Sequence, residues 1–456
     1  MKLYNFLSRK VEEFKPSGKT AASNAADVGL YTCGPTVYDF VHIGNWRTFV
    51  FEDILKRVLA FNGYKVNHVM NITDIDDKVI NRAKSEKTTI RNLTRKYTDA
   101  FFGDLEKLNI IKADKYPIAT DHINSMIRII ELLVKGGFAY VRDGSVYFSI
   151  AKFKGYGKLS GANIKGVKAG ARVDVDEYDK DNPQDFALWK KESEDAKKRH
   201  EAFDSPWGVG RPGWHIECSA MSMQYLGESF DIHTGGVDLL FPHHENEIAQ
   251  SEGATGKKFV NFWCEGEHLL VEGEKMAKRL GNIFTLKDVI EKGFDPVALR
   301  YLFLTAHYRS QLNFTWKSLE AAQNALNNLR GEVENWDTPK VGCAEFEGNF
   351  KEAINNDLDM PKASSVLWEM VKSDYPTSAR HRSILSMDKV LGLGLDQVKG
   401  AELPKGAKEL IARREQLRAE GDYEASDKMR KELKSIGVEV EDTSEGPKWK
   451  VKRGSR

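Results

Sequence analysis

Residues 241–249 read Phe-Pro-His-His-Glu-Asn-Glu-Ile-Ala and place two imidazoles and two carboxylates in five consecutive positions after a proline. Proline favours the first turn of a helix, so Pro242 predicts that a helix begins here. His243 and Glu247 then share a face at i and i+4, as His244 and Glu247 do at i and i+3. Either pair could bind a metal. The residues also fit a polar, solvated helix start with acidic groups near the positive end of its dipole.

Residues 33–45, Cys-Gly-Pro-Thr-Val-Tyr-Asp-Phe-Val-His-Ile-Gly-Asn, lie between an expected strand and an expected helix. The free N–H groups and the dipole at such a helix start favour phosphate. Gly44 lets a ligand approach the backbone closely, and His42 and Asn45 bring side-chain donors. The segment has neither a Walker lysine nor a Gly-x-Gly-x-x-Gly pattern, which excludes the P-loop and dinucleotide classes.

Residues 274–282, Glu-Lys-Met-Ala-Lys-Arg-Leu-Gly-Asn, form a second basic segment. Lys275, Lys278 and Arg279 supply three cations in five residues, with Gly273 and Gly281 on either side. A mobile loop of this kind suits the neutralisation of a polyphosphate. Taken alone, the segment fits a solvated basic turn equally well.

The elements that must position these residues alternate between strand and helix. Residues 28–33 and 64–70 predict strands, and residues 47–61 have apolar side chains at helical spacing. The alternation indicates a parallel sheet with crossover helices, in which ligands bind at the carboxyl ends of the strands. The 33–45 loop and the segment Asn-Ile-Thr-Asp-Ile-Asp-Asp from Asn71 both lie at such ends. Strand patterns resume at residues 230–233 and 259–264.

The rest of the chain divides into three further kinds of segment. A helix around residues 123–135, a strand at 145–150 and a charged, Gly-rich stretch indicate an insertion at 113–206. Apolar spacing is almost wholly helical over residues 286–398, which predicts a helical bundle. After a Pro/Gly boundary at 403–406 we expect two charged helices, at 407–420 and 423–436, and a short strand at 438–440.

Bulk composition narrows the class of protein. The chain of 456 residues carries 68 Lys and Arg against 67 Asp and Glu, so any nucleic-acid surface must be a local patch. No apolar run approaches the roughly 20 residues that span a bilayer, and we expect a cytoplasmic protein without membrane contact. The four cysteines form no Cys-x-x-Cys pair, which argues against a disulfide framework or a zinc finger.

Together, His-Ile-Gly-Asn at 42–45 and Lys-Met-Ala-Lys-Arg at 275–279 resemble the His-Ile-Gly-His and Lys-Met-Ser-Lys-Ser signatures of class I aminoacyl-tRNA synthetases. Four longer blocks resemble the cysteinyl-tRNA synthetase family: the segments that begin at Cys33, Asn71 and Phe241, and Gly-Arg-Pro-Gly-Trp-His-Ile-Glu-Cys-Ser-Ala-Met from Gly210. The resemblance covers nearly the whole chain. It implies an α/β fold, with residues 1–112 and 207–264 as a Rossmann-like parallel-sheet catalytic domain. It further implies an inserted connective domain at 113–206, a signature-loop and stem-contact region at 265–315, a helical bundle at 316–402 and a small C-terminal anticodon-binding domain at 403–456.

The resemblance implies one zinc ion per chain, with Cys33, Cys218, His243 and Glu247 as its ligands. It thereby selects His243 over His244. Zinc binds a thiolate strongly and a serine hydroxyl poorly, so it would distinguish cysteine from serine chemically where shape alone discriminates weakly. We find no sign of a separate editing site.

The family also implies L-cysteine, ATP with Mg²⁺ and the cysteine tRNA as partners, and we expect a monomer. His42, Asn45, Lys275 and Lys278 are implied to act on the ATP phosphates, with His42, Asn45 and Lys278 binding them. Further implied contacts to cysteine and adenylate are Gly34, Thr36, Thr48, Thr73, Trp214, His233, Gly236 and Asp238. The basic tail around Trp449 could grip a phosphate backbone and stack a base, although a solvated, frayed terminus fits it too.

Three positions depart from the family signatures. Asn45 replaces a histidine, and Ala277 and Arg279 replace two serines. Two other functions therefore stay open: a ligase that joins activated cysteine to the amine of a small sugar, and a non-catalytic RNA-binding paralogue. Because the sugar ligases lack a full anticodon-binding end, the helices after Lys405 favour tRNA as the acceptor.

Overall fold

The computed structural model describes the whole chain except residues 18–26, 162–184, 399–403, 405, 444–445 and 452–456. A four-stranded parallel sheet with the order β10, β9, β3, β4 lies at its centre. Its strands are β3 Asp27–Thr32, β4 Lys65–Met70, β9 Phe230–Gly236 and β10 Val260–Gly266. The predicted parallel α/β fold is confirmed, and β3 and β4 lie within one residue of the expected ranges.

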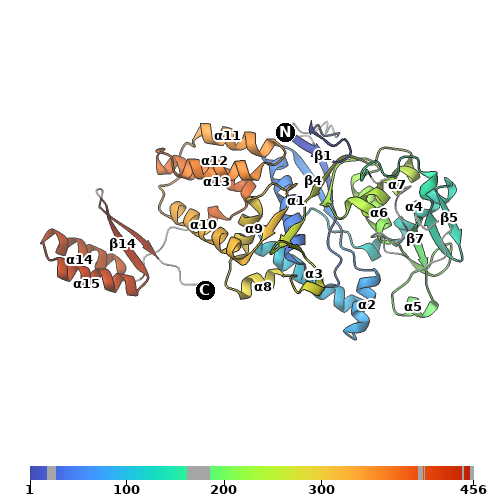
Figure 1. Cartoon of the computed structure of the whole chain (residues 1–456), viewed down its shortest axis with the longest axis horizontal. Coiled ribbons are helices and arrows are strands. Elements are labelled where there is room, and N and C mark those ends of the chain that lie inside the picture. The colour runs from blue at the N-terminus through green and yellow to red at the C-terminus, as the bar shows by residue number, and fades with distance from the viewer. Residues whose placement is uncertain (18–26, 162–184, 399–403, 405, 444–445, 452–456) are drawn as a thin grey trace.

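The two faces of this sheet enter two different cores. Leu30 faces the core that contains α1, Ile43–Phe61, whereas the next residue, Tyr31, faces the core of α6, Trp214–Leu226, and α7, Glu245–Thr255. Successive side chains of a strand point to opposite faces, so a strand buried on both sides carries an almost continuous apolar run. α1 and the α6–α7 pair therefore lie on opposite sides of the central strands (Figure 1).

An insertion follows the second strand of the sheet. Its helix α4, Ile123–Lys135, has the predicted bounds and packs on α6 and α7. A second, antiparallel sheet contains β5 Ala139–Arg142, β6 Ser145–Phe148, β7 Phe186–Lys191 and β8 Gly210–Pro212. β8, which follows residue 206, pairs with β7 and so joins this antiparallel sheet. At the start of the insertion, Lys115 and Ile118 still pair beside the end of β4, several residues beyond the predicted boundary at 113.

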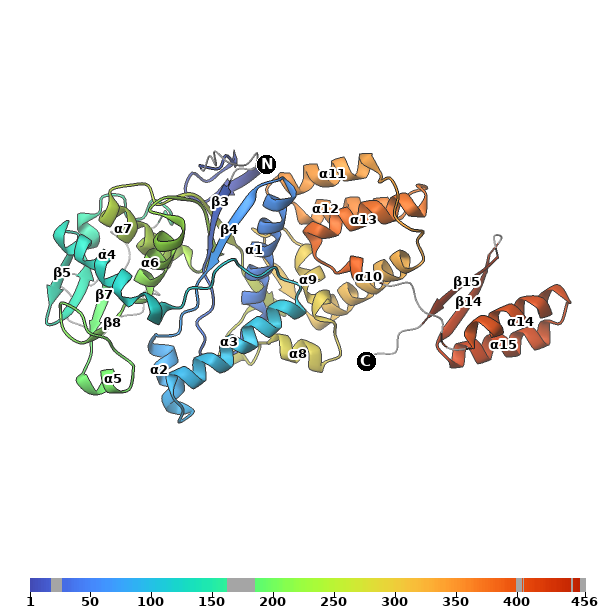
Figure 2. The ribbon, with the colours of Figure 1, turned by 180° about the vertical axis from the view of Figure 1, so that it is seen from behind.

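Several short elements frame these two sheets. At the N-terminus β1 pairs with β2, and two helices connect β4 to the insertion. The strands are β1 Lys2–Asn5 and β2 Lys10–Glu13, and the two helices are α2 Asp77–Ser85 and α3 Ile90–Lys107. A further short helix, α5 Glu194–Lys198, lies between β7 and β8. Figure 2 shows α2 and α3 extending below the central sheet on the side of α1.

After β10 the chain forms a small three-stranded sheet and then helices. The sheet has the order β12, β11, β13, with β11 Leu269–Val271, β12 Glu274–Lys275 and β13 Leu312–Phe314. The helices are α8 Leu286–Glu291, α9 Pro296–Leu304, α10 Trp316–Glu334, α11 Ala344–Asn355, α12 Met360–Val371 and α13 Thr377–Leu391. The predicted helical bundle is present, and the described residues 286–398 are almost wholly helical, with the short strand β13 as an interruption. Among the described residues, no helix is long and apolar enough to cross a membrane.

The C-terminal residues form a separate small lobe. It contains α14 Ala407–Ala419, α15 Tyr423–Ser435 and a hairpin of β14 Val438–Thr443 with β15 Gly446–Val451 (Figure 1). A small core of its own holds the lobe together, built from Ala407, Leu433, Val438 and Val440. The helices match the sequence-based ranges closely. The frayed terminus considered for the tail is wrong for residues 446–451, which pair with β14.

Candidate functional site

Four distant segments bring the predicted zinc ligands to one place. Cys33 directly follows β3, Cys218 lies in α6, His243 lies in a π-helical turn at Leu240–His244, and Glu247 lies in the first turn of α7. One ligand atom from each residue lies within 4.8 Å of the others, and all four residues are buried. The expected helix start at Pro242 is therefore a π turn that continues into α7, and it keeps His243 and Glu247 on one face.

The separations within this cluster fit a tetrahedral zinc ion. Zinc–sulfur bonds of about 2.3 Å place two tetrahedral sulfur ligands about 3.8 Å apart, and bonds of about 2.0 Å place nitrogen and oxygen ligands about 3.3 Å apart. The Cys33 and Cys218 Sγ atoms are 3.9 Å apart, and His243 Nε2 is 3.1 Å from Glu247 Oε1. Glu247 Oε1 is buried and has His243 Nε2 as its close neighbour, which leaves it able to bind a metal ion. These four residues therefore fit the ion.

The pKa values of the two thiols are shifted in opposite directions. The hydrogen bond from Cys33 lowers the pKa of Cys218 to about 6, and the nearby His243 acts in the same direction against the effect of burial. Burial raises the pKa of Cys33 well above its usual value, and the Cys218 thiolate adds to that shift. At neutral pH the pair thus holds one proton and one negative charge.

The imidazole and the carboxylate stabilise each other's charge. Burial alone would lower the pKa of His243, but Glu247 and Cys218 outweigh it and raise the value to about 10. Burial would raise the pKa of Glu247, but His233 and His243 together hold it below the usual value. His243 Nδ1 lies 2.8 Å from Nδ1 of His215, whose own pKa is well below normal because of burial and the neighbouring cation.

A second group of possible ligands overlaps the first. It shares Cys33 and Glu247 but replaces the other two residues by His233 and His244. His244 Nε2 lies 3.6 Å from Cys33 Sγ, while its Nδ1 contacts Glu265 at 2.8 Å. His233, predicted as a substrate contact, is fully buried and bonds to Glu247 Oε2 at 2.9 Å. Geometry alone therefore leaves both His243 and His244 as candidate metal ligands.

Trp214 covers the cluster from the outside. Its indole lies 4.3 Å from the His243 ring, measured between ring centroids, and the residue is 38% exposed. Trp214 is therefore not a core residue. A half-exposed aromatic side chain over a buried polar cluster is suited to cover an apolar part of a ligand.

The phosphate-binding side of the predicted site is the start of α1. His42 is the N-cap, and its Nδ1 accepts a hydrogen bond from the Asn45 backbone N–H at 3.2 Å. Burial lowers the pKa of His42, although Asp238 partly opposes the shift. The neutral ring therefore carries its proton on Nε2. The Asn45 side chain is exposed beside it.

The two signature segments are in contact. A Cβ atom added at Gly44 would lie 2.1 Å from Cε of Met276, so the Met276 side chain packs directly on Gly44 and would have to shift for any larger residue. Asn282 closes the basic loop on itself, since its Oδ1 accepts from the Ala277 N–H and its Nδ2 donates to the Lys275 carbonyl. Lys275 is exposed in β12, and Lys278 begins a short 3₁₀ turn, with its side chain outside the described part of the chain.

The remaining predicted contacts gather at the carboxyl ends of the strands. Thr36 and Thr73 form a parallel bridge between the loops that follow β3 and β4. A Cβ atom at Gly236 would lie 2.4 Å from Asp238 Oδ1 and 3.7 Å from Thr48 Oγ1, which places these three residues together. A Cβ atom at Gly34 would meet the Asn71 carbonyl at 1.8 Å, so close backbone packing already requires this glycine.

Two polar residues missed by the sequence analysis connect these contacts. Asn71 accepts from the Gly34 N–H at 2.9 Å and donates to Thr73 Oγ1 at 3.1 Å. Thr73 Oγ1 in turn donates to Glu217 at 2.8 Å, next to Cys218. The spacing Asn-x-Thr at the end of a buried strand was visible, but nothing in the sequence indicated that its partner lies in α6.

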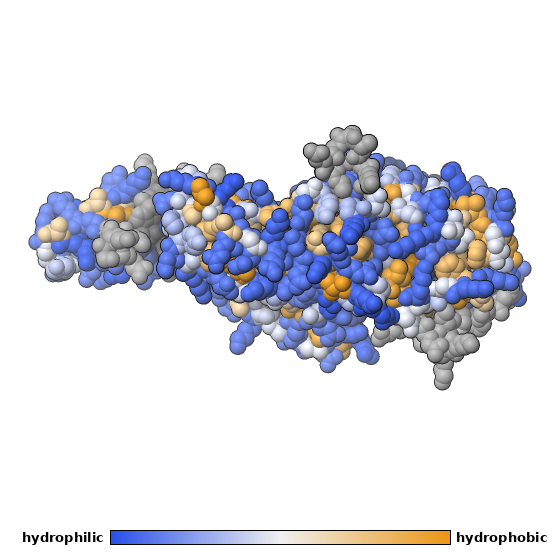
Figure 3. All heavy atoms as spheres, turned by 90° about the horizontal axis from the view of Figure 1, so that it is seen from above, coloured by the Kyte–Doolittle hydropathy of each residue, from blue (hydrophilic) through white to orange (hydrophobic). Residues whose placement is uncertain are grey.

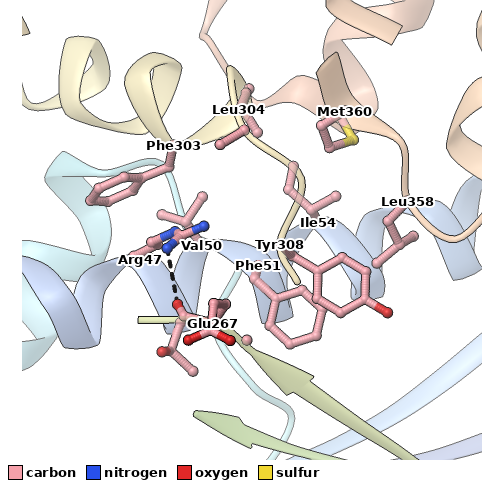
Figure 4. A pocket seen from close by; sticks show the side chains of 13 residues that line it. Arg47, Val50, Phe51, Ile54, Glu267, Phe303, Leu304, Tyr308, Leu358 and Met360 are labelled. Atoms are coloured by element: carbon pink, nitrogen blue, oxygen red, sulfur yellow. Dashed lines mark hydrogen bonds between the residues drawn. The ribbon is translucent and has the colours of Figure 1, made fainter. Parts of the chain in front are cut away.

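A small cavity lies between α1 and α9, and the predicted substrate contact Thr48 is among the residues that line it. It has a volume of about 30 Å³, and mostly apolar side chains line it, among them Phe51, Ile54, Phe303 and Met360 (Figure 4). That volume corresponds to one or two water molecules, so neither an amino acid nor a nucleotide fits it. Trp449, predicted to contact tRNA, lies far from both places, in β15 of the C-terminal lobe.

Comparison with known proteins decides the family. Residues 19–324 match the model of the class I (C) tRNA synthetase catalytic domain, and residues 400–449 match that of the cysteinyl-tRNA ligase anticodon binding domain. A cysteine–tRNA ligase of Chlamydia muridarum is 46% identical, with 98% of this chain and 99% of that protein covered. The chain belongs to the cysteine–tRNA ligase family. This family of enzymes uses cysteine, ATP and tRNA, and the chain charges tRNA with cysteine.

Other relatives in this family are equally complete. The cysteine–tRNA ligases of Brachyspira hyodysenteriae and Methanosarcina mazei are 44% and 43% identical, and the matches cover 98% and 99% of this chain and 99% of each relative. A solved Mycobacterium tuberculosis methionyl-tRNA synthetase with methionyl-adenylate has a TM-score of 0.56 at 15% identity, over 84% of this chain and 92% of that one. This last likeness shows the fold alone. The cysteine–tRNA ligase relatives and the match to the anticodon binding domain favour a tRNA ligase over the non-catalytic paralogue and the sugar ligase.

Proposed function

We propose that this cysteine–tRNA ligase forms a cysteinyl-adenylate before transfer to tRNA, and that a zinc ion held by Cys33, Cys218, His243 and Glu247 selects cysteine by its thiolate. The observation that carries the zinc proposal is the buried set of two thiols, one imidazole and one carboxylate at tetrahedral separations. When bound there, zinc would supply a borderline-soft Lewis acid that favours a thiolate over a hydroxyl.

The protein's own residues would place the substrate cysteine between this cluster and ATP. Trp214 would cover the cysteine side chain, because its indole already lies against His243. Thr36, Thr73 and Gly34 lie in the paired loops that follow β3 and β4, where we propose that the cysteine amino and carboxylate groups reach them. The Asn71 and Glu217 side chains hold Thr73 in one orientation and thereby restrict the substrate's position.

Phosphate recognition would come from the start of α1 and from the basic loop. Attack of the cysteine carboxylate on the α-phosphorus increases negative charge on the phosphoryl oxygens and on the leaving pyrophosphate, so fixed donors and cations should dominate catalysis. His42 would donate from Nε2 and Asn45 from its exposed amide, while Lys275 and Lys278 supply positive charge from the loop. Mg²⁺ would accompany the ATP polyphosphate.

Three further substrate contacts and one tRNA contact belong to this proposal. Thr48, Gly236 and Asp238 lie together near His42, which suits contact with the nucleoside part of the adenylate. Trp449 is proposed to contact tRNA, because its lobe matches an anticodon-binding family. We also propose that the chain divides in function as it does in fold, into catalytic, inserted, bundle and anticodon-binding parts.

Cysteine-dependent exchange of labelled pyrophosphate into ATP, combined with elemental analysis, tests both steps. The zinc-loaded enzyme should catalyse exchange with cysteine and not with serine. Lys278→Ala should slow this exchange and leave cysteine binding unchanged, and Cys218→Ser should lose zinc and cysteine activation together. Absence of exchange in the zinc-loaded enzyme would refute the adenylate route, and unchanged zinc in Cys218→Ser would remove that residue from the site.

A further inference from the structure

The guanidinium group of Arg47, in the second turn of α1, donates hydrogen bonds to four backbone carbonyls. Nη1 donates to the carbonyls of Glu267 and His268 at 3.0 and 2.5 Å, and Nη2 donates to those of His307, at 3.3 Å, and Ser310. The residue is only 5% exposed. Figure 4 shows it reaching from α1 toward Glu267 at the end of β10.

These four carbonyls belong to the two segments that precede β11 and β13. Both strands are part of the three-stranded sheet from which the basic loop, residues 274–282, extends. Glu267 and His268 directly precede β11, and residues 307–310 precede β13, which pairs with β11. The other neighbour of β11 is β12, which carries Lys275. One side chain of α1 therefore fixes the base of the sheet from which the basic loop extends.

The start of α1 also contacts the far end of the same loop. The Ile43 N–H donates to the Phe284 carbonyl at 2.8 Å, and His42 forms an antiparallel bridge with Thr285. Met276 packs against Gly44 between these two anchors. The first two turns of α1 thus contact the loop before it begins, within it and after it ends.

Burying the charge of an arginine at this position costs free energy that a purely structural contact would not require. Burial lowers the pKa of Arg47 to about 10, so the group is still charged at neutral pH. Well-packed apolar residues often replace a buried charge without loss of stability. What a guanidinium adds is a planar, rigid arrangement of donors that fixes several acceptors in one orientation, which an ammonium cannot do.

We propose that Arg47 is a positioning residue for the ATP-dependent step: it sets the separation between His42 at the start of α1 and the segment of Lys275 and Lys278. Arg47 acts through these segments and does not itself contact the phosphates. The inference rests on the proposed use of His42 and the basic loop to bind ATP.

The test is steady-state pyrophosphate exchange by Arg47→Lys, which keeps the charge but loses the fork of donors. A misplacement of about 1 Å can reduce a rate on the order of 100-fold, so kcat/KM for ATP should fall by roughly that factor. The KM for cysteine and the zinc content should stay within about twofold, because the cluster lies on the opposite side of the sheet from α1. Arg47→Ala should lose more, and added guanidinium ion should restore part of its rate.

Arg57→Lys is the matched control. Arg57 lies on the same helix and also donates to backbone carbonyls, those of Lys389 and Asn109, which lie away from the signature loop. Its replacement should lower the Tm and leave the ATP parameters unchanged, and guanidinium should not stimulate Arg57→Ala.

Four results would overturn the inference: unchanged ATP parameters in Arg47→Lys, equal losses for cysteine and ATP, the same ATP defect in Arg57→Lys, or failure of both Arg47 variants to fold. If instead the unaltered enzyme shows no cysteine-dependent exchange at all, the proposed adenylate route fails, and the two failures are thereby distinguished.

Discussion

His243 and His244 are adjacent in the chain, and their ring centroids are 5.7 Å apart, yet they face different partners. The π turn directs His243 toward Glu247 and Cys218, whereas both nitrogens of His244 are engaged, one with Glu265 and the other near Cys33. A histidine whose second nitrogen bonds to a buried carboxylate can also be a metal ligand. Each overlapping set of four residues therefore makes a distinct prediction for zinc content.

We expect His243→Asn to lose most of its zinc and His244→Asn to retain it. Loss of a supporting neighbour typically lowers metal affinity about 10–100-fold, so loss of a true ligand should exceed roughly 100-fold. Zinc per chain, measured after dialysis against a weak chelator, gives the comparison. The opposite pattern would move the ion to the set that contains His233 and His244.

Proton release provides a second test of the same cluster at the residue scale. Metal ligands must be deprotonated, and at pH 7.5 Cys218 and Glu247 already are, because the pKa of Cys218 is about 6 and that of Glu247 is lowered. The pKa of Cys33 is raised and that of His243 is about 10, so both hold protons that zinc must displace.

Zinc binding to the metal-free protein at pH 7.5 should therefore release about two protons. Zinc affinity should rise with pH above neutrality and should fall more steeply below about pH 6, where Cys218 also takes up a proton. Calorimetry in buffers of different ionisation enthalpy measures the number released. A value near zero would mean that Cys33 is already ionised and His243 already neutral without metal.

At the scale of elements, α1 is fixed to the helical bundle by buried ionic contacts. Asp53 of α1 bonds to Arg57 at 2.7 Å and to Arg300 of α9 at 2.6 Å, and Arg300 and Asp53 are almost wholly buried. Arg300 also donates to the Leu391 carbonyl at the end of α13 at 2.7 Å. The contacts connect three helices that are far apart in sequence (Figure 2).

Removing Arg300 should destabilise the enzyme strongly, because Asp53 would keep a buried charge with one partner fewer. Breaking a buried pair in this way costs about 3–5 kcal/mol, and for a chain of this size we expect the Tm to fall by roughly 5–10 °C. Thermal denaturation of Arg300→Met measures the loss. Arg95→Ala is the control, because the Arg95–Asp99 pair is 82% and 73% exposed and such pairs contribute only about 0–1 kcal/mol.

Elements with long apolar patterns could be predicted from the sequence, whereas several short paired strands could not. The range 123–135 of α4 was predicted without error because an amphipathic helix repeats its pattern over several turns. β8, β13 and β15 have three to six residues, and each exists because a partner strand lies beside it. The site shows the same limit, since Glu217 and Arg47 gain their roles from partners distant in sequence.

At the scale of the whole molecule, hydrophobic side chains form cores of very different extent. One core runs from the central sheet through α1 and α9 into α11, α12 and α13, so the bundle and the catalytic part share their interior. The C-terminal lobe has a separate small core. The face in Figure 3 is mostly hydrophilic with scattered apolar areas, as expected where apolar residues are exposed singly.

A chain that ends at Pro404 should therefore remain folded and keep the first half-reaction. The truncation removes no residue of the core that the catalytic part shares with the bundle. The rate of pyrophosphate exchange should stay within about twofold, because the proposed ATP and cysteine contacts all precede residue 280. Charging should suffer, since two linked binding modules typically exceed either one by about 100-fold or more in affinity for a common ligand. The KM for tRNA in the charging reaction measures this loss. If the shortened chain also loses exchange, the C-terminal lobe is needed for folding, and its separate core does not make it an independent binding module.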